Sequence, residues 1–393
     1  MSSDDRAGAD PANLVLTGAT GFVGSFLLAE LLAKTRARIH CLVRCRDADE
    51  GRSRLAQTLA SAGFPELARS PRIVPVQADL SKPKLGLADD DFDALAGSVD
   101  AVYHCGAFVN FIYPYSVLKH TNVLGTQEML RLASKPSPKP FHYISTLRVF
   151  GSFGGPEPDV IDEETGLDHN WRLHSGYAQS KWVAERLVRL AGERRLPVAT
   201  YRLGMISGHS RTGVSNLTDV LSRMIKGCIQ LGTAPDLEML VDVTPVDYVA
   251  SAVVHLSQRK ESLGKAFHLV TMHPVPWNDL TDWLRRFGYP LRRLSFETWR
   301  AELLEVARQS PDNAMSPLVL FFLDEMPSLA MRRFGCRNTL EGLVGSGITC
   351  PPASADLLAT YLAYFAESGF LDRPSGTGDL SWRERQMPDA GVA

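Results

Sequence analysis

The sequence predicts an α/β fold in which a doubly wound parallel sheet is followed by a smaller, mainly helical domain. Short apolar runs with the length of strands alternate with amphipathic segments with the length of helices. The predicted strands are residues 14–16, 39–43, 73–76, 101–103, 141–145 and 199–203. This alternation is typical of βαβ units, in which helices cover both faces of a parallel sheet. A glycine-rich turn after the first strand supports the same fold.

The alternation fades after about residue 205, and this change sets the predicted domain boundaries. We expect 217–231 and most of 275–370 to be helical, and we expect strands at 239–243 and 266–270 to rejoin the sheet. The prediction is a Rossmann-type nucleotide-binding domain over 13–208 and about 239–270. A substrate domain would comprise about 209–238 and 271–371. Residues 1–12 and 372–393 are rich in polar residues, Pro and Gly, and are predicted to be flexible tails.

The glycine turn predicts a dinucleotide site. Gly18, Gly21 and Gly24 connect the first strand to an apolar-periodic helix over about 25–33. In such units the first glycine permits the tight turn, and the second lets backbone N–H groups approach a pyrophosphate. The third lets the helix pack on the strand, and the anion lies at the helix N-terminus. The turn residues expected to contact the cofactor are Gly18, Thr20, Gly21, Phe22, Val23 and Gly24.

The end of the second strand indicates which dinucleotide binds. A site for NAD places an acidic residue there, whereas this sequence has Arg44, with Arg54 ten residues later. Guanidinium groups can bind a 2′-phosphate through two parallel hydrogen bonds, so NADPH is the predicted cofactor. The alternative is that these arginines belong to the solvated start of a helix and bind no phosphate, because the acidic Asp47 and Glu50 lie close by.

Two further strand ends are expected at the ligand edge of the sheet. Asp79 and Leu80 follow the third strand, and Gly106 and Ala107 follow the fourth. In doubly wound sheets the carboxyl ends of the strands face the ligand. These four residues are therefore predicted to line the cofactor site.

A tyrosine and a lysine are the candidate catalytic residues. Tyr177 and Lys181 are four residues apart in a helix predicted over 178–190, so they share one helix face. A nearby cation stabilises phenolate and is expected to lower the pKa of Tyr177, which would then act as a general acid. Thr146, at the end of the fifth strand, would hold the substrate oxygen. Strand alternation sends the competing hydroxyl of Ser145 to the opposite face.

Composition limits the other classes of function. The net charge of −2 argues against nucleic acid as a bulk electrostatic partner. The six cysteines show no C-x-x-C spacing and the chain has no H-E-x-x-H, so neither a disulfide framework nor a metal site is predicted. The start of the chain lacks the apolar core of a signal peptide, and no apolar run is long enough to span a membrane. We therefore expect a cytoplasmic protein.

These motifs resemble a known superfamily. The glycine turn, Asp79-Leu80, residues 122–126, Ser145-Thr146 and the Tyr177/Lys181 pair are similar to those of the extended short-chain dehydrogenase/reductases, over about 13–270. Within that superfamily, residues 104–115 followed by 122–126 resemble the thioester reductase domains that end nonribosomal peptide and polyketide synthetases and carboxylic acid reductases.

The resemblance implies an activity and assigns roles. Such domains release an acyl or peptidyl chain from phosphopantetheine with NADPH, giving an aldehyde and, by further reduction, a primary alcohol. The partner would be a carrier protein, and the chain a monomeric domain of a larger synthetase. The implied triad is Thr146, Tyr177 and Lys181; Asn122 would organise a proton-relay water, and Arg44 with Arg54 would hold the adenosine phosphate. Leu203 stands where the family commonly has proline beside the nicotinamide, and Gly204 after it permits close approach.

Three other functions share parts of this pattern. Fatty acyl-CoA reductases perform the same chemistry on a free coenzyme A ester. Nucleotide-sugar epimerases and dehydratases share the fold and triad but retain NAD, which Arg44 disfavours. A non-enzymatic dinucleotide sensor would often lack the Tyr177/Lys181 pair. The sequence therefore favours thioester reduction.

Several other residues keep two interpretations. The aromatic residues between 108 and 115 could line an acyl channel or pack in the core. His104, His169 and His174 are expected to be structural. Basic clusters in the later domain could dock an acidic carrier protein or be solvated. These clusters are Arg285-Arg286, Arg292-Arg293 and Arg332-Arg333 with Arg337.

Overall fold

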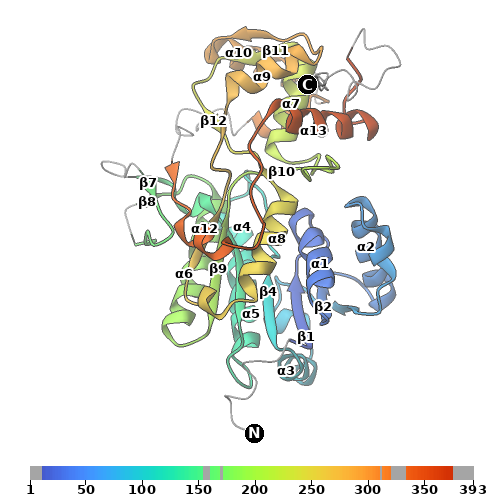
Figure 1. Cartoon of the computed structure of the whole chain (residues 1–393), viewed down its shortest axis with the longest axis vertical. Helices are drawn as coiled ribbons and strands as arrows, with labels where there is room; N and C mark the ends of the chain where they lie inside the picture. The colour runs from blue at the N-terminus through green and yellow to red at the C-terminus, as the bar shows by residue number, and fades with distance from the viewer. Residues whose placement is uncertain (1–10, 154–159, 169–170, 310–311, 320–332, 375–393) are drawn as a thin grey trace, which may run out of the picture. The chain divides into compact units, whose positions relative to one another are not determined.

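The structure is a computed structural model that describes residues 11–153, 160–168, 171–309, 312–319 and 333–374 (Figure 1). The chain divides into two compact units. Unit 1 comprises Met1–Gly204, Val246–Val270 and Arg332–Cys350. Unit 2 comprises Met205–Pro245, Thr271–Met331 and Pro351–Ala393.

Unit 1 is built on a seven-stranded parallel sheet in the order β14-β9-β5-β4-β1-β2-β3. Its strands are β1 (Asn13–Thr17), β2 (Arg38–Val43), β3 (Ile73–Gln77), β4 (Ala101–His104), β5 (Phe141–Thr146), β9 (Val198–Leu203) and β14 (Ala266–Leu269). The sheet confirms the predicted α/β fold and all six strands expected before residue 205. The strand expected at 266–270 also rejoins the sheet, as β14 beside β9.

The strand order reverses between β1 and β4. Leu14 on β1 is in register with Ile39 on β2 and with Ala101 on β4, so β1 has parallel neighbours on both sides. The chain runs outward from β1 to β3 and then crosses back to β4. In open parallel sheets, the crevice at such a reversal is where ligands bind.

Helices cover both faces of this sheet (Figure 1). On one face lie α3 (Asp89–Ser98), α5 (Gly125–Ser134) and α6 (Gly176–Glu193), which share a buried apolar cluster with β1, β2, β4, β5 and β9. The remaining helices of unit 1 include α1 (Phe22–Lys34), α2 (Ala48–Ser61), α8 (Val246–Ser257) and α12 (Arg337–Leu343). Of these, α8 packs against α1 and α12. Strands covered on both faces read as continuous apolar runs, which explains why the sequence reveals them clearly.

Shorter elements complete unit 1. They are α4 (Tyr115–Lys119), a π-helical turn η3 (His120–Leu124), the 3-10 turns η1 (Pro65–Arg69), η2 (Pro83–Gly86), η4 (Leu147–Val149) and η5 (Lys260–Ser262), and the short strands β6 (Ser152–Phe153), β7 (Val160–Ile161), β8 (Trp171–Arg172) and β17 (Arg333–Phe334). The turn η4 directly follows β5, so it lies at the carboxyl edge of the sheet.

Unit 2 is mainly helical, as the sequence predicts. Its helices are α7 (Val220–Leu231), α9 (Trp277–Arg286), α10 (Phe296–Gln309) and α13 (Ala355–Glu367), with the 3-10 turn η6 (Ser316–Leu318). Three two-stranded pairs join β10 (Ile206–Ser207) to β13 (Thr244–Pro245), β11 (Thr233–Pro235) to β16 (Arg292–Leu294), and β12 (Leu240–Val241) to β15 (Val275–Pro276). The indoles of Trp277 and Trp299 are fully buried in its core.

The predicted strand at 239–243 does not rejoin the main sheet. Its central residues form β12, which pairs antiparallel with β15 inside unit 2. Asp242 fixes this segment, because its carboxylate accepts hydrogen bonds from the backbone N–H groups of Met205 (2.8 Å) and Thr271 (3.2 Å). The boundary between the units therefore falls after Gly204 rather than after residue 208, and 239–245 belongs to unit 2.

The predicted assignment of all of 271–371 to the second domain is also wrong, because Arg332–Cys350 belongs to unit 1. In this segment β17 pairs with β7, and the buried carboxylate of Glu163 caps α12. Glu163 accepts hydrogen bonds from the backbone N–H of Asn338 and from the N–H and hydroxyl of Thr339. These contacts join residues far apart in sequence, so periodicity could not reveal them.

Candidate active site

The glycine turn has the geometry that a dinucleotide requires. Gly18 has φ of +76°, a left-handed conformation that favours glycine. The N–H of Gly21 donates to the carbonyl of Gly18 at 2.8 Å, which closes the turn. A Cβ atom on Gly24 would lie 1.9 Å from the oxygen of Gly18, so the first turn of α1 packs directly against the turn. The positions of Gly18 and Gly24 therefore have no room for larger residues.

The ends of three strands meet at this turn. A Cβ atom on Gly18 would lie 2.8 Å from Cα of Gly106, which follows β4. A Cβ atom on Gly106 would lie 2.7 Å from Cδ1 of Leu80, which follows β3. The structure thus brings together three groups of predicted cofactor residues.

The N-terminus of α1 can accept a phosphate. Among the described residues no side chain caps this end of α1, and its first turn contains no acidic residue. Backbone N–H groups at such a helix end, together with the helix dipole, attract anions. These features fit the dinucleotide predicted from the turn.

The two predicted arginines are connected: Arg44 follows β2, and Arg54 on α2 contacts its backbone. The guanidinium of Arg54 donates to the backbone carbonyl of Arg44, and the Arg44 side chain is exposed. Arg46 instead pairs with Glu50 at 2.8 Å. Burial raises the pKa of Asp79, but hydrogen bonds from Ser81 and the charge of Arg44 outweigh it and hold the value below the ordinary one. An ionised Asp79 thus faces the positive charge of Arg44.

A buried histidine on β4 connects β1 to the start of α5. Thr17 Oγ1 accepts the N–H of Gly106 and bonds His104 Nδ1, both at 2.8 Å. His104 Nε2 bonds Thr126 Oγ1 at 2.9 Å, and this hydroxyl donates to the carbonyl of Asn122. Because the Thr126 proton is used there, His104 carries its proton on Nε2. Burial and the charge of Lys181 lower the pKa of His104 to about 3, so it is neutral and structural, as expected from the sequence.

Asn122 connects the segment after β4 to α6. Its amide oxygen accepts the N–H of Phe108 at 2.7 Å. Its amide nitrogen donates to the carbonyl of Phe108 at 3.0 Å and to Ser180 Oγ at 2.9 Å. The Ser180 hydroxyl in turn donates to the carbonyl of Tyr177. Both N–H groups of the Asn122 amide therefore donate to acceptors within the protein. The role of Asn122 in organising a proton-relay water stays a prediction.

The first turn of α6 positions the candidate acid. Ser175 caps the helix by accepting the N–H of Ala178 at 3.2 Å. A Cβ atom on Gly176 would lie 2.5 Å from the carbonyl oxygen of Tyr113, so glycine lets the aromatic segment lie against the start of the helix. The ring of Phe111 meets the Tyr177 ring edge to face at 5.4 Å. The phenol of Tyr177 is thus held between α6 and this segment.

The electrostatics of the pair differ from the sequence prediction. Burial raises the pKa of Tyr177 to about 12, and the nearby charge of Arg148 opposes this increase. The ammonium of Lys181 donates to the carbonyl of Ile144 at 2.8 Å and lies 4.2 Å from the centre of the Tyr143 ring. The pKa of Tyr177 is therefore raised rather than lowered, because desolvation of a buried phenol outweighs the nearby charge of Arg148.

The two hydroxyls at the end of β5 are used differently. Ser145 Oγ donates to the buried carboxylate of Glu185 on α6. Thr146 Oγ1 instead accepts the N–H of Arg148 at 3.3 Å, which leaves its proton for another acceptor. Thr146 is also in register with Leu203 at the end of β9, and the N–H of Gly204 donates to Leu269 on β14. This geometry supports Thr146 rather than Ser145 as the hydroxyl that would hold the substrate oxygen.

Comparison with known proteins identifies the family. The family model described as "Male sterility protein", an NAD-binding model, matches residues 16–253. The solved terminal R domain of the myxalamid PKS-NRPS pathway is 45% identical, each chain is covered to 93%, and the TM-score is 0.88. The chain belongs to the terminal reductase domains. It is an oxidoreductase with a site for a nicotinamide dinucleotide.

Other relatives agree with this assignment. The reductase (R) domain of a nonribosomal peptide synthetase from Mycobacterium tuberculosis is 28% identical, with 94% of this chain and 97% of that chain covered and a TM-score of 0.80. A linear gramicidin synthase from Brevibacillus parabrevis is 41% identical over 91% of this chain, and isonitrile lipopeptide synthase from Streptomyces coeruleorubidus is 40% identical over 94%. The chain spans 7% and 25% of the lengths of these two synthetases.

The aromatic segment of the reductase domain is not part of the core. Phe108 is 39% exposed and Tyr113 is 46% exposed, and their rings meet edge to face at 5.8 Å. Phe111 and Tyr115 are half-buried. The core-packing interpretation is therefore wrong for Phe108 and Tyr113, and the acyl-channel interpretation remains.

The basic clusters are partly neutralised. Asp282 pairs with Arg285 at 3.4 Å and with Arg293 at 2.8 Å. Arg292 lies 3.9 Å from Glu302, and Arg286 is exposed. These residues belong to unit 2, whereas Arg333 and Arg337 belong to unit 1. Arg332 and His169 lie outside the described residues, and His174 is exposed.

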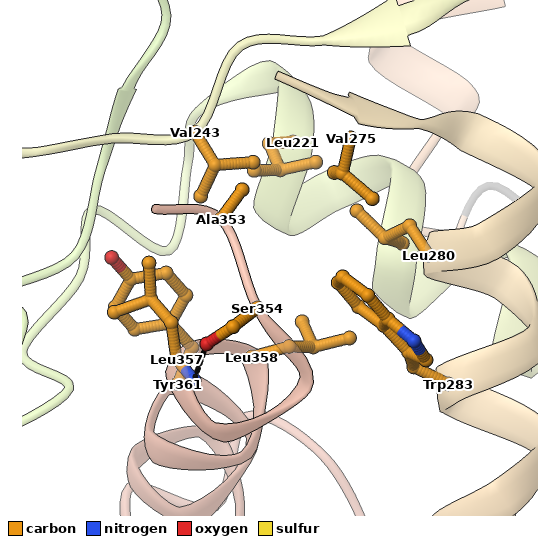
Figure 2. A pocket seen from close by; sticks show the side chains of 10 residues that line it. All are labelled: Leu221, Val243, Val275, Leu280, Trp283, Ala353, Ser354, Leu357, Leu358 and Tyr361. Atoms are coloured by element: carbon orange, nitrogen blue, oxygen red, sulfur yellow. Dashed lines mark hydrogen bonds between the residues drawn. The ribbon is translucent and has the colours of Figure 1, made fainter. Parts of the chain in front are cut away.

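An apolar pocket in unit 2 is too small for an acyl chain (Figure 2). Its walls include Val243, Val275 and Trp283, and its volume of about 10 Å³ leaves room for about one water molecule. Ser354, at its edge, accepts the N–H of Leu357 and caps α13. We therefore attribute this pocket to the packing of unit 2.

Metal ligands and membrane-spanning helices are absent from the described part of the chain. No group of three or more His, Cys, Asp or Glu among these residues could hold a metal ion. No described helix is long and apolar enough to cross a membrane.

Sequence reasoning missed several residues of the site. Thr17 and Ser180 adjoin the selected Gly18 and Lys181, and Arg148 lies two residues after the selected Thr146. Glu185 could have been found, because it follows Lys181 by one further helical step of four residues.

We predict that Gly24→Ala weakens dinucleotide binding at least tenfold and lowers the melting temperature. The new Cβ would overlap the carbonyl of Gly18, so the turn must move away from the position that receives the phosphates. NADPH fluorescence titration and thermal unfolding measure both effects. Gly97→Ala in α3 is the matched control, because a Cβ there meets nothing within 4 Å. Unchanged affinity in Gly24→Ala would show that the turn does not position the cofactor.

Proposed function

We propose that this reductase domain uses NADPH to release an acyl or peptidyl chain from the phosphopantetheine thioester of a carrier protein. The observation that carries the proposal is the hydrogen bond from Lys181, four residues after Tyr177 on α6, to the carbonyl of Ile144 on β5, two residues before Thr146. The names of the relatives, which include a linear gramicidin synthase and an isonitrile lipopeptide synthase, support a substrate bound to a synthetase. The exposed Phe108 and Tyr113 would contact an apolar chain.

The residues would act on the thioester carbonyl. A bound nicotinamide dinucleotide supplies a hydride to the carbonyl carbon. The hydroxyl of Thr146 donates a hydrogen bond to the carbonyl oxygen, and Tyr177 transfers its proton to that oxygen as negative charge develops. The C–S bond of the resulting thiohemiacetal then breaks, giving an aldehyde and a free thiol. Lys181 stabilises the phenolate that Tyr177 leaves behind.

The buried state of Tyr177 suits this role. With a pKa near 12 in the free chain, the phenol is fully protonated at neutral pH and is therefore ready to donate. The nearby charge of Arg148 would offset part of the cost of a buried phenolate.

We assign binding of the acyl or peptidyl substrate, or of its carrier protein, to unit 2. The exposed Arg285, Arg286 and Arg292 would suit an acidic carrier surface and the phosphate of the phosphopantetheine arm.

The triad is tested by substitution. We predict that Tyr177→Phe lowers kcat by roughly 10²–10⁴-fold, since it removes the proton donor. Thr146→Val should act mainly on kcat, and Lys181→Ala on both kcat and NADPH affinity.

The assay is NADPH oxidation with a carrier-bound acyl thioester, and Ser145→Thr is a control that retains a hydroxyl at the competing position. A Tyr177→Phe enzyme with a near-native rate would refute the mechanism, and equal turnover of free acyl coenzyme A would favour a fatty acyl-CoA reductase.

Cofactor preference is tested at the end of β2. We predict that NADPH binds more tightly than NADH, and that Arg44→Ala reduces this preference about tenfold, since a charge-assisted hydrogen bond contributes about 1.5 kcal/mol. Fluorescence titration with both cofactors measures it. Arg194→Ala, at the far end of α6, removes the same charge and should leave the preference unchanged. Equal affinity for both cofactors in the native protein would contradict the assignment of NADPH.

The extent of reduction is tested by stoichiometry. We predict that two NADPH are consumed for each chain released, because the same residues can activate the aldehyde and an aldehyde is a better electrophile than a thioester. Mass spectrometry should then identify a primary alcohol. One NADPH per chain, with the aldehyde as sole product, would limit the reaction to two electrons.

A further inference from the structure

Glu185 continues the catalytic face of α6. Tyr177, Lys181 and Glu185 follow one another at four-residue intervals, so they lie on one side of the helix. The Glu185 residue is fully buried, and its side chain is 1% exposed. One carboxylate oxygen accepts Nε and Nη2 of Arg202, at 2.9 and 2.8 Å. The other accepts the hydroxyl of Ser145, the neighbour of Thr146.

Arg202 is itself fixed by several elements. Its Nη1 donates to the carbonyl of Glu163 at 3.2 Å and lies 3.1 Å from Nε2 of His268 on β14. Its guanidinium lies 4.8 Å from the centre of the Phe150 ring. Because Arg202 is held from these sides, the Glu185 carboxylate has a fixed position beside a permanent positive charge.

Lys181 depends on this carboxylate. Its ammonium is buried, and burial lowers the pKa of Lys181 to about 8, while the charge of Glu185 opposes the decrease. The other titratable groups around it, Tyr177 on α6, Tyr143 on β5, and His104 and Cys105 at the end of β4, are neutral at pH 7. Among the described residues that interact with Lys181, Glu185 thus carries the negative charge that favours the protonated ammonium.

We propose that Glu185 is a positioning residue that keeps Lys181 protonated and, through Ser145, fixes the strand end that carries Thr146. The inference rests on the roles proposed above for Lys181 and Thr146. A buried carboxylate held by arginine serves both tasks, because it supplies charge to one member of the triad and a hydrogen bond beside another.

The charge task is tested with Glu185→Gln, which keeps the size of the side chain and an acceptor for Arg202. Without the negative charge, Lys181 loses its proton at lower pH. We expect the alkaline limb of the kcat/KM profile, and of NADPH affinity, to move down by roughly one pH unit. Glu193→Gln, exposed at the end of the same helix, is the matched control. A merely structural role would lower activity at every pH without moving the limb.

The outcomes separate this inference from the proposed function. An unmoved limb in Glu185→Gln, in an enzyme that Lys181→Ala inactivates, would overturn the inference alone. Full turnover in Lys181→Ala would overturn the proposed triad itself. If Glu185→Gln fails to fold because Arg202 is left unpaired, Glu185→Gln/Arg202→Gln removes both buried charges and should move the limb in the same direction but by less, because a positive charge is lost as well.

The positioning task is tested with Ser145→Ala. This change removes one hydrogen bond and keeps the charge of Glu185, so we expect kcat to fall severalfold with the alkaline limb in place. An unchanged kcat would show that Ser145 does not transmit the position of Glu185 to Thr146.

Discussion

The close approach of β1 to β4 is the constraint on which the site depends. Gly18 and Gly106 meet where neither could carry a side chain, and Thr17 and His104 hold the two strand ends together by hydrogen bonds. The chain of bonds continues through Thr126 to Asn122. The glycine turn, η3 and, through the hydrogen bond from Asn122 to Ser180, α6 are therefore parts of one network. A neutral, fully buried histidine suits this task because it donates at one nitrogen and accepts at the other.

The helix α6, which carries Tyr177 and Lys181, is fixed at two points along the face that they share. Near its start, Ser175 caps the backbone, and Ser180 connects Tyr177 to Asn122. Two turns further on, Glu185 connects the helix to β9 through Arg202. Buried ion pairs contribute little net stability, since desolvation offsets much of their attraction. The pair therefore makes better sense as a device for orientation and charge than as a source of stability.

The two units have separate structural roles in the fold. Unit 1 contains the parallel sheet, the glycine turn and the N-terminus of α1. Unit 2 has its own core around Trp277 and Trp299, and its described residues contribute no strand to the main sheet. Helices packed on an independent core can vary in sequence without disturbing the sheet edge.

The sequence by itself determined the parallel sheet, the glycine turn and the candidates Thr146, Tyr177 and Lys181. Strands buried on both faces leave continuous apolar runs, and turn glycines and residues four apart on a helix are local patterns. Only the tertiary structure decided what depends on distant contacts. Residues 239–245 join unit 2 through Asp242, α12 returns to unit 1 through Glu163, and burial raises the pKa of Tyr177. Desolvation and long-range hydrogen bonds depend on which segments meet in space, and local sequence patterns do not specify that.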